Sequence, residues 1–228
     1  MFKKNTDRFS RSLFARDILQ SLRLAILSGE LKANHRLVES QIAEEYVVSR
    51  GPVRSALHAL EQQGLVRSLP SGGTEVVGFS QKHAIDLFIV RQQMEQFAAH
   101  LIMQLDNLDT SVLHNITNAM EMEPSIERLH DLDLNFHLEY MKLTDNWALL
   151  QSWITLAPII SDMLTFTNSL FKDYHLVAAN HKLYVECIEK RDLALLLKKI
   201  DENFQFPLKL ISERFSGTYQ SNSQSYRR

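Results

Sequence analysis

The sequence predicts a mainly α-helical chain with two domains, an N-terminal winged helix-turn-helix and a C-terminal all-helical bundle of about six helices. The chain has 228 residues, of which 45% are hydrophobic, so it is long enough to bury two cores. Strand-like segments with glycine-rich turns occur only before residue 79, and no glycine lies between Gly78 and Gly217. We therefore expect domains at residues 1–78 and 79–215 and a polar tail at residues 216–228.

The N-terminal segment predicts three helices. Between Ser12 and Leu27, apolar residues recur at steps of three and four, which is the period of an amphipathic helix. A short second helix is expected from Glu39 to Tyr46. Ser49 is a natural N-cap for a third helix that runs to about residue 62, with Pro52 tolerated in its first turn. The two short helices, joined by a tight turn, outline a helix-turn-helix.

A β-hairpin is expected after the third helix. Residues 65–69 and 74–77 have the composition of short strands, and the Pro-Ser-Gly-Gly sequence at residues 70–73 is typical of a tight turn. This hairpin is the predicted wing.

Two arginines lie at the predicted start of the third helix. Arg50 and Arg54 are one helical turn apart on one face, so both can reach base edges if this helix enters the major groove. Ser49 and the free backbone N–H groups beside it can bind a phosphate. The alternative is that both arginines are solvated surface charges. The surrounding helix-turn-helix and wing favour the DNA-binding interpretation.

The charge distribution agrees with this interpretation. The net charge is −2 overall, but residues 1–78 contain 11 Lys and Arg against 8 Asp and Glu, whereas residues 79–228 contain 14 against 19. Only the first domain is therefore expected to contact DNA phosphates.

Specific residues in this segment resemble the winged helix of the GntR family of bacterial regulators: Leu37, Val38, Glu39, Ile42, Ala43, Val48, Ser49, Arg50, Gly51, Pro52, Val53, Arg54, Ala56, Leu57, Leu60, Glu61, Gly64, Leu65 and Val66. The resemblance implies operator recognition by Arg50 and Arg54, with the wing tip in the minor groove. The candidate DNA-contacting residues are Arg36, Ser40, Gln41, Ser49, Arg50, Gly51, Pro52, Arg54, Ser71, Gly72 and Gly73. Gly51 stands where the family usually has threonine, so a hydroxyl contact to phosphate is lost.

The C-terminal segment predicts long helices at residues 80–105, 110–122, 125–143, 147–167, 173–190 and 192–215. Pro158 is expected to kink the fourth of these. Asp133 and His137 are four residues apart, which places a carboxylate and an imidazole on one helical face. Such a pair is more often packed or solvated than metal-bound, and His181 is the only further candidate ligand with a defensible position.

A second resemblance covers roughly residues 80–215. The pattern is similar to the FadR-type C-terminal (FCD) domain of one GntR subgroup, as seen in Arg91, Glu95, Asp133, Phe136, His137, Asn146, His181 and Asp192. This resemblance implies a divalent ion such as zinc, nickel or manganese, held by one aspartate and three histidines beside a small carboxylate effector. The ligands would be Asp133, His137 and His181. The fourth position falls on Asn203, whose amide oxygen is a weaker ligand than imidazole.

Alternatives remain at this site. The polar residues can instead bind one another, or bind an organic ligand without a metal. Arg91 can hold the effector carboxylate through its guanidinium, or it can pair with Glu95, its i+4 neighbour.

The remaining composition excludes several classes of protein. Cys187 is the only cysteine, so an intrachain disulfide or a thiolate cluster is impossible. We expect no membrane-spanning run and no secretory signal, and hence a soluble cytoplasmic protein without a membrane partner.

Together these features predict a homodimeric repressor or activator that binds a palindromic operator and responds to a small-molecule effector, and that is not an enzyme. Two alternatives are a metal-dependent hydrolase using Asp133, His137 and His181, and a metal-free sensor of an acyl thioester.

Overall fold

The computed structural model describes residues 6–168 and 174–215. It divides into two compact units, residues 1–80 and residues 81–228, which are described separately below. The polar tail expected at residues 216–228 lies outside the described residues. Helices dominate both units and strands occur only in the first, so the predicted fold class is confirmed for the described residues.

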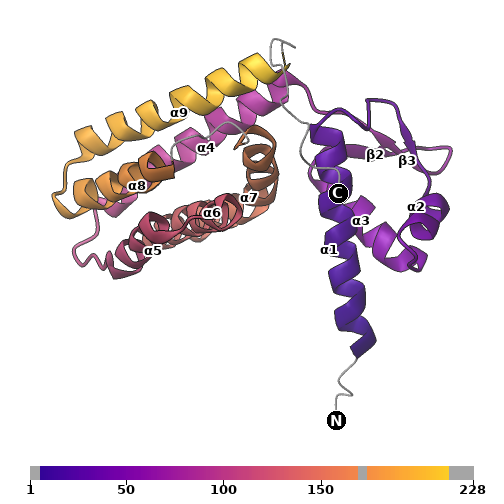
Figure 1. The fold of residues 1–228 in the computed structure, drawn as a ribbon, viewed down its shortest axis with the longest axis horizontal. Coiled ribbons are helices and arrows are strands. Elements are labelled where there is room, and N and C mark those ends of the chain that lie inside the picture. Colours follow the sequence, from indigo (N-terminus) through magenta and orange to yellow (C-terminus); the bar gives the residue numbers. More distant parts are fainter. Residues whose placement is uncertain (1–5, 169–173, 216–228) are drawn as a thin grey trace. The chain divides into compact units, whose positions relative to one another are not determined.

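The first unit combines three helices with a small sheet (Figure 1). The helices are α1 (Thr6–Leu27), α2 (Glu39–Glu45) and α3 (Arg50–Gln62). The strands β1 (Arg36–Leu37), β2 (Val66–Ser68) and β3 (Thr74–Val76) form an antiparallel sheet in the order β1-β3-β2. Helix α1 packs along α3, and one core joins all of these elements. That core includes Ile18, Ile26, Val53, Leu57, Leu60, Val66 and Val76, all at most 4% exposed.

The predicted wing is the β2–β3 hairpin, in which Val66 pairs with Val76 and Ser68 with Thr74. Gly72 and Gly73 have φ values of 83° and 93°, which only glycine adopts without strain. Strand β1 was not expected, because two residues carry no periodic signal. It pairs Arg36 with Glu75 and so joins the start of the helix-turn-helix to the wing.

The turn between α2 and α3 contains a strained residue. Val47 has a φ of 52° and its side chain is 89% exposed. The left-handed region is unfavourable for a β-branched residue because its Cβ crowds the following carbonyl oxygen. Since the side chain is almost fully solvated, packing does not offset this strain.

Replacing Val47 with glycine is therefore expected to stabilise the first unit by about 1 kcal/mol, because glycine adopts this φ without the steric cost. Urea denaturation followed by circular dichroism measures the change. Leu13→Gly is the matched control, since Leu13 is 46% exposed inside helix α1 of the same unit and glycine there should destabilise by about 0.5–1 kcal/mol. Equal destabilisation by both variants would contradict the conclusion that the backbone of Val47 is strained.

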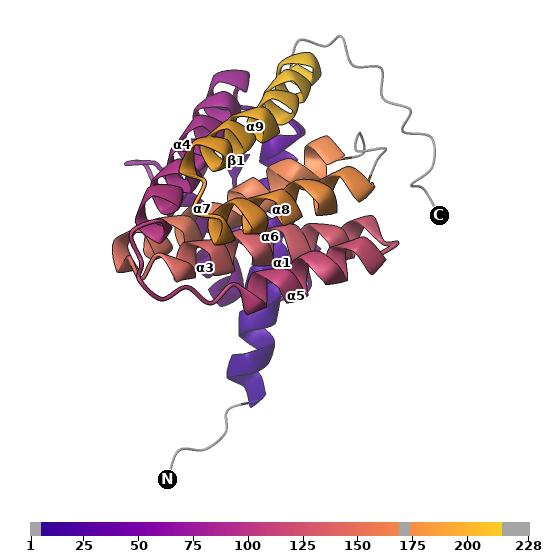
Figure 2. The same ribbon diagram turned by 90° about the vertical axis from the view of Figure 1, so that its left-hand side faces the viewer.

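The second unit is a bundle of long helices (Figures 1 and 2). They are α4 (Gln81–Ile102), α5 (Ser111–Met122), α6 (Ile126–Leu143), α7 (Trp147–Asn168), α8 (Tyr174–Glu189) and α9 (Leu193–Phe215). Helix α4 packs along α9 and also against α6 and α7, while α5 packs against α6 and α8. Large side chains such as Phe88, Phe136, Tyr140, Trp153 and Tyr184 are buried at the centre. The expected boundaries differ from these by a few residues at most.

Helix α7 departs from the expectation of no membrane-spanning run, because its segment Trp147–Thr165 has the length and the apolar composition of a membrane-spanning helix. Only 39% of this segment is buried, although Trp153, Ile160 and Met163 lie in the core. A core helix of a bundle meets the same criterion. The finding is therefore weak evidence for a membrane span, but it shows that α7 exposes apolar surface.

Candidate functional site

The first turn of α3 is open to solvent. Ser49 has the extended backbone of an N-cap, with φ −73° and ψ 162°, but its side chain makes no capping hydrogen bond. Ser49, Arg50 and Gly51 are all exposed. A Cβ added at Gly51 would contact only the Ser49 Oγ, at 3.8 Å. The backbone N–H groups of this turn are therefore accessible to an anion such as a DNA phosphate.

Pro52 does not belong to this exposed surface, which corrects one of the candidate contacts. Its side chain is buried together with Val53, Ala56, Leu57 and Leu60 on the inner face of α3. The ring fixes the backbone at the start of the helix and cannot itself contact a duplex.

Arg54 is exposed and paired. Its Nε and Nη2 atoms donate to the two carboxylate oxygens of Glu39 at 3.2 and 3.0 Å. The pKa of the Glu39 carboxyl is held below its usual value by this hydrogen-bonded pair and by the charge of Arg50. Ser40 and Gln41, which follow Glu39 in α2, are exposed. Sequence reasoning included Glu39 in the family motif but did not identify it as the partner of Arg54.

The wing tip is held by Arg36. Its Nη2 donates to the carbonyl oxygen of Gly72 at 2.8 Å. A Cβ added at Gly73 would lie 3.2 Å from the Arg36 Nε, so the guanidinium packs directly against this glycine. Ser71, Gly72 and Gly73 are exposed. Arg36 thus organises the wing tip that was expected to enter a minor groove.

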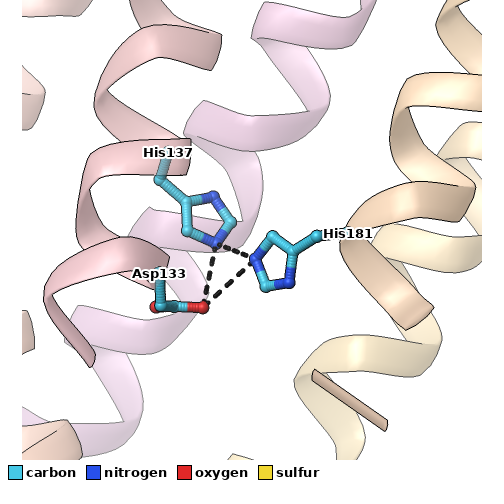
Figure 3. Close-up of side chains that lie close together, drawn as sticks. All are labelled: Asp133, His137 and His181. Carbon is cyan, nitrogen blue, oxygen red and sulfur yellow. Dashed lines mark hydrogen bonds and ion pairs between the residues drawn. The ribbon is translucent and has the colours of Figure 1, made fainter. Parts of the chain in front are cut away.

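In the second unit, Asp133, His137 and His181 converge from α6 and α8 (Figure 3). The His181 Nε2 lies 3.1 Å from the Asp133 Oδ1 and 3.3 Å from the His137 Nε2. The distance between the His137 Nε2 and the Asp133 Oδ1 is 3.8 Å. Ligands held about 2.1 Å from one metal ion are separated from one another by roughly 3.0–3.4 Å, so the three atoms are close to the spacing of one coordination sphere.

The outer ring nitrogens of both histidines face acceptors. The His181 Nδ1 lies 2.8 Å from the carbonyl oxygen of Val177, and the His137 Nδ1 lies 3.2 Å from the Glu95 Oε1, although the latter pair lacks the alignment of a hydrogen bond. In the neutral form of either ring, such a neighbour favours the proton on Nδ1. Both Nε2 atoms then present lone pairs toward each other and toward a carboxylate oxygen. A cation between them removes this repulsion, so the residues fit a metal ion.

Two ligands also have the protonation state that metals require. Burial opposes ionisation of Asp133, but its contacts with His181, His137 and Arg91 outweigh burial and hold the carboxyl pKa well below its usual value. Burial, with the charge of Arg91, lowers the pKa of His137 well below its usual value. Asp133 is therefore an anion and His137 is neutral at neutral pH.

Arg91 lies next to these three residues and is only 6% exposed. Its Nε donates to the Glu95 Oε1 at 2.9 Å, and its Nη2 is 3.9 Å from the Asp133 Oδ2. The rings of Phe88, Trp153 and Phe204 surround the guanidinium, with centroids 5.4–6.0 Å from its central carbon. The structural pairing of Arg91 with Glu95 is thus present, and the guanidinium also borders the candidate metal ligands.

Asn203 is hydrogen-bonded to a residue of the neighbouring helix. Its Oδ1 accepts a hydrogen bond from the Asn180 Nδ2 at 3.1 Å, which links α9 to α8. This hydrogen bond uses one of the two lone pairs of the amide oxygen, so the expectation that Asn203 is a fourth ligand stays a prediction. The three converging ligands leave a coordination position for Asn203, water or an effector.

Buried polar atoms near the cluster lack hydrogen-bond partners among the described residues. They are the Glu95 Oε2, the Asp133 Oδ2 and the Tyr184 hydroxyl. Glu95 and Tyr184 are 0% and 1% exposed. Unpaired buried polar atoms are costly, so these atoms are natural contacts for a bound ligand. Sequence reasoning missed Tyr184, although it lies three residues after His181 and therefore on the same helical face.

Two family descriptions match the chain. "Bacterial regulatory proteins, gntR family" matches residues 14–76, and "FCD domain" matches residues 86–204. Both lie where the sequence resemblances placed them, one in each compact unit.

Similar proteins are transcription regulators. The gluconate operon transcriptional repressor of Bacillus subtilis is 26% identical over 198 residues, covering 82% of this chain and 80% of its own. The same-named repressor of Bacillus licheniformis is 28% identical, covering 80% of this chain and 79% of its own. A structure described with the Listeria monocytogenes protein Lar has a TM-score of 0.69 at 18% identity over 93% of this chain and 99% of its own.

A GntR family member from Pseudomonas syringae has a TM-score of 0.52 at 22% identity over 91% of this chain and 90% of its own. These two structures support the fold. Together, the families and relatives confirm the prediction of a ligand-responsive DNA-binding regulator and contradict the hydrolase alternative.

Proposed function

The chain belongs to the GntR family of bacterial regulatory proteins and carries an FCD domain, and from this we propose that it is a homodimeric cytoplasmic repressor whose operator binding is controlled by a metal-assisted carboxylate effector. The observation that carries the DNA-binding part is the open first turn of α3 with Arg50 and Arg54 on its surface. In this proposal residues 1–78 bind the operator and residues 79–215 bind the effector.

Operator recognition depends on α3 and the wing. Arg50 and Arg54 contact base edges in the major groove, and the N–H groups at Ser49 and Gly51 bind a phosphate. Ser40, Gln41 and Arg36 flank these contacts, and the wing tip at Ser71, Gly72 and Gly73 follows the minor groove. This assignment is supported by the exposure of all these residues.

Arg50→Ala and Arg54→Ala are each expected to weaken binding to the selected operator by about 1–3 kcal/mol, because each removes a donor pair to a base edge. Selection of bound sites from a random DNA pool supplies the operator, and fluorescence anisotropy measures the affinity. Arg128→Ala is the control, since it removes an exposed arginine from the second unit. Wild-type affinity in both α3 variants would refute the assignment.

The charges around the cluster favour a carboxylate effector. Burial raises the pKa of Glu95, but with both Glu95 and Asp133 counted as carboxylates and Arg91 as the counter-ion of one of them, the buried group keeps one net negative charge. A divalent ion held by Asp133, His137 and His181 would leave one net positive charge there. A monocarboxylate would neutralise it, and burial strongly favours neutrality. When bound, the ion supplies Lewis acidity that orients the effector carboxylate.

The effector class follows from the same residues. Arg91 can donate to the effector carboxylate, while the Tyr184 hydroxyl and the Glu95 Oε2 are available for neighbouring hydroxyl groups. Two relatives are named as repressors of gluconate operons. We therefore place the effector among hydroxylated small carboxylates, the class to which sugar acids belong.

A homodimer is supported by exposed apolar side chains on two helices that pack against each other. Ile89, Val90 and Phe97 on α4 are 44–49% exposed, and Trp147 and Ile154 on α7 are 76% and 47% exposed. A second copy that covers these side chains would bury them and provide the two-fold symmetry of a palindromic operator.

A further inference from the structure

Glu39 forms a bidentate ion pair, called the fork below, with Arg54. This pair occupies one edge of the Arg54 guanidinium, which the proposed function assigns to DNA. The Arg54 Nε and Nη2 atoms donate to the two oxygens of Glu39 at 3.2 and 3.0 Å. The Arg54 side chain nevertheless remains 70% exposed, against 32% for Glu39. A guanidinium has five N–H groups, and this contact uses two of them. No hydrogen bond or ion pair with the described residues involves the edge formed by Nη1 and the second N–H of Nη2.

The free edge has the geometry needed for base recognition. Two parallel N–H groups match the O6 and N7 acceptors of guanine. An unpaired arginine side chain samples many rotamers, whereas Glu39 restricts Arg54 to one orientation relative to α2 and α3. Because α2 begins at Glu39 and α3 carries Arg54, the fork also fixes this orientation to the helix-turn-helix itself.

The pair contributes little as a stability device. Exposed ion pairs gain little Coulomb energy because water screens them, and they lose side-chain entropy. Arg50 offers a contrast, since no ion pair or hydrogen bond of its side chain occurs among residues 6–168 and 174–215. Among the described residues, the Arg54 side chain is thus held by a bidentate contact, whereas that of Arg50 is not.

Resting on the proposed operator binding, we infer that Glu39 is a positioning residue that sets base specificity at the position contacted by Arg54. Its carboxylate holds the guanidinium toward a base edge. The Glu39 carboxylate also neutralises the positive charge of Arg54, which would otherwise pair with any phosphate. Glu39 therefore favours specific over non-specific binding, while Arg50 supplies contacts that do not depend on it.

Glu39→Gln tests this inference in the full chain, because it keeps the side-chain size and removes the charge. Anisotropy titrations with the selected operator and with a scrambled duplex, over a range of salt concentrations, measure both affinities. We expect operator affinity to fall about tenfold and non-specific affinity to rise about twofold to threefold with a steeper salt dependence. Glu39→Gln should weaken the preference for one base only at the operator position where Arg54→Ala also weakens it.

Two controls separate positioning from a general effect of charge or folding. Glu44→Gln removes an exposed carboxylate from the same helix and should leave the ratio of specific to non-specific affinity unchanged. Glu39→Gln should have no further effect in an Arg54→Ala background, as coupling between the two residues requires. Three outcomes would each overturn the inference. Glu39→Gln could leave the ratio of specific to non-specific affinity unchanged, or it could bind the operator more tightly at wild-type selectivity. Its effect on operator affinity could also add fully to that of Arg54→Ala. If the wild-type protein selects no site at all, the proposed function itself fails.

Discussion

Replacing Glu95 with glutamine is expected to lower the free energy of unfolding by about 3 kcal/mol, although the two side chains have nearly the same size. Glu95 is 0% exposed and accepts a hydrogen bond from the Arg91 Nε at 2.9 Å. Arg91 is 6% exposed, so the substitution leaves a buried guanidinium without its nearest counter-ion. The amide oxygen can still accept the hydrogen bond, so the loss is that of the charge, and Asp133, 3.9 Å from the Arg91 Nη2, compensates it only in part. Removing one partner of a buried pair typically costs about 3–5 kcal/mol.

Urea denaturation, with and without a metal chelator, measures this loss. We expect a lower urea midpoint and an unchanged slope of the free energy of unfolding against urea concentration. The double variant Arg91→Met with Glu95→Leu should recover most of it, because aromatic rings already surround the site of the guanidinium. Asp86→Asn is the exposed control, since Asp86 pairs with Lys82 at i,i+4 and should change stability by less than about 0.5 kcal/mol. A Glu95→Gln effect as small as this control would show that the buried pair is not needed for stability.

Adding zinc, nickel or manganese to metal-free protein is expected to raise its stability, by about 2.7 kcal/mol when the free ion reaches a hundred times its dissociation constant. His181→Gln should abolish this gain, because the amide cannot reproduce an Nε2 lone pair that lies 3.1 Å from the Asp133 Oδ1 and 3.3 Å from the His137 Nε2. Thermal unfolding and elemental analysis of protein purified without a histidine tag supply the two measurements.

His100→Gln is the matched control for the metal experiment, since it removes an exposed imidazole from α4. Asn203→His gives the opposite test. Imidazole is a stronger ligand than an amide, so this variant should bind zinc or nickel about tenfold more tightly despite losing the hydrogen bond from Asn180. Protein that holds less than about a tenth of an ion per chain and shows no metal-induced shift would exclude the metal proposal. A shift with an acyl thioester instead would favour the metal-free alternative.

Periodicity was enough to locate the helices. In α3 the buried residues recur at three- and four-residue steps, and in the C-terminal unit six helices lie within a few residues of their expected positions. The hairpin followed from its turn chemistry, because Gly72 and Gly73 permit a positive φ. Strand β1 escaped notice because two residues are too short to show alternation, and its pairing with β3 depends on tertiary contacts.

The candidate metal site was only partly predictable. The i,i+4 spacing of Asp133 and His137 placed two ligands on one helix, but no local pattern shows that α8 brings His181 to within 3.3 Å of His137. That step came from the family resemblance. The pairing of Asn203 with Asn180 joins residues 23 apart on different helices, so it depends on packing alone. The same is true of the burial of Pro52, which sequence reasoning assigned to the DNA surface.

The contact between Arg36 and the wing tip limits how operator preference can drift during evolution. Any side chain at residue 73 would meet the guanidinium at 3.2 Å and would have to adopt a φ of 93°, while loss of Arg36 would release the carbonyl of Gly72. If the wing contacts DNA as proposed, inherited changes in minor-groove preference should therefore accumulate at Ser71, which is exposed and free of both constraints. A lineage that alters Gly73 would first have to displace the Arg36 guanidinium.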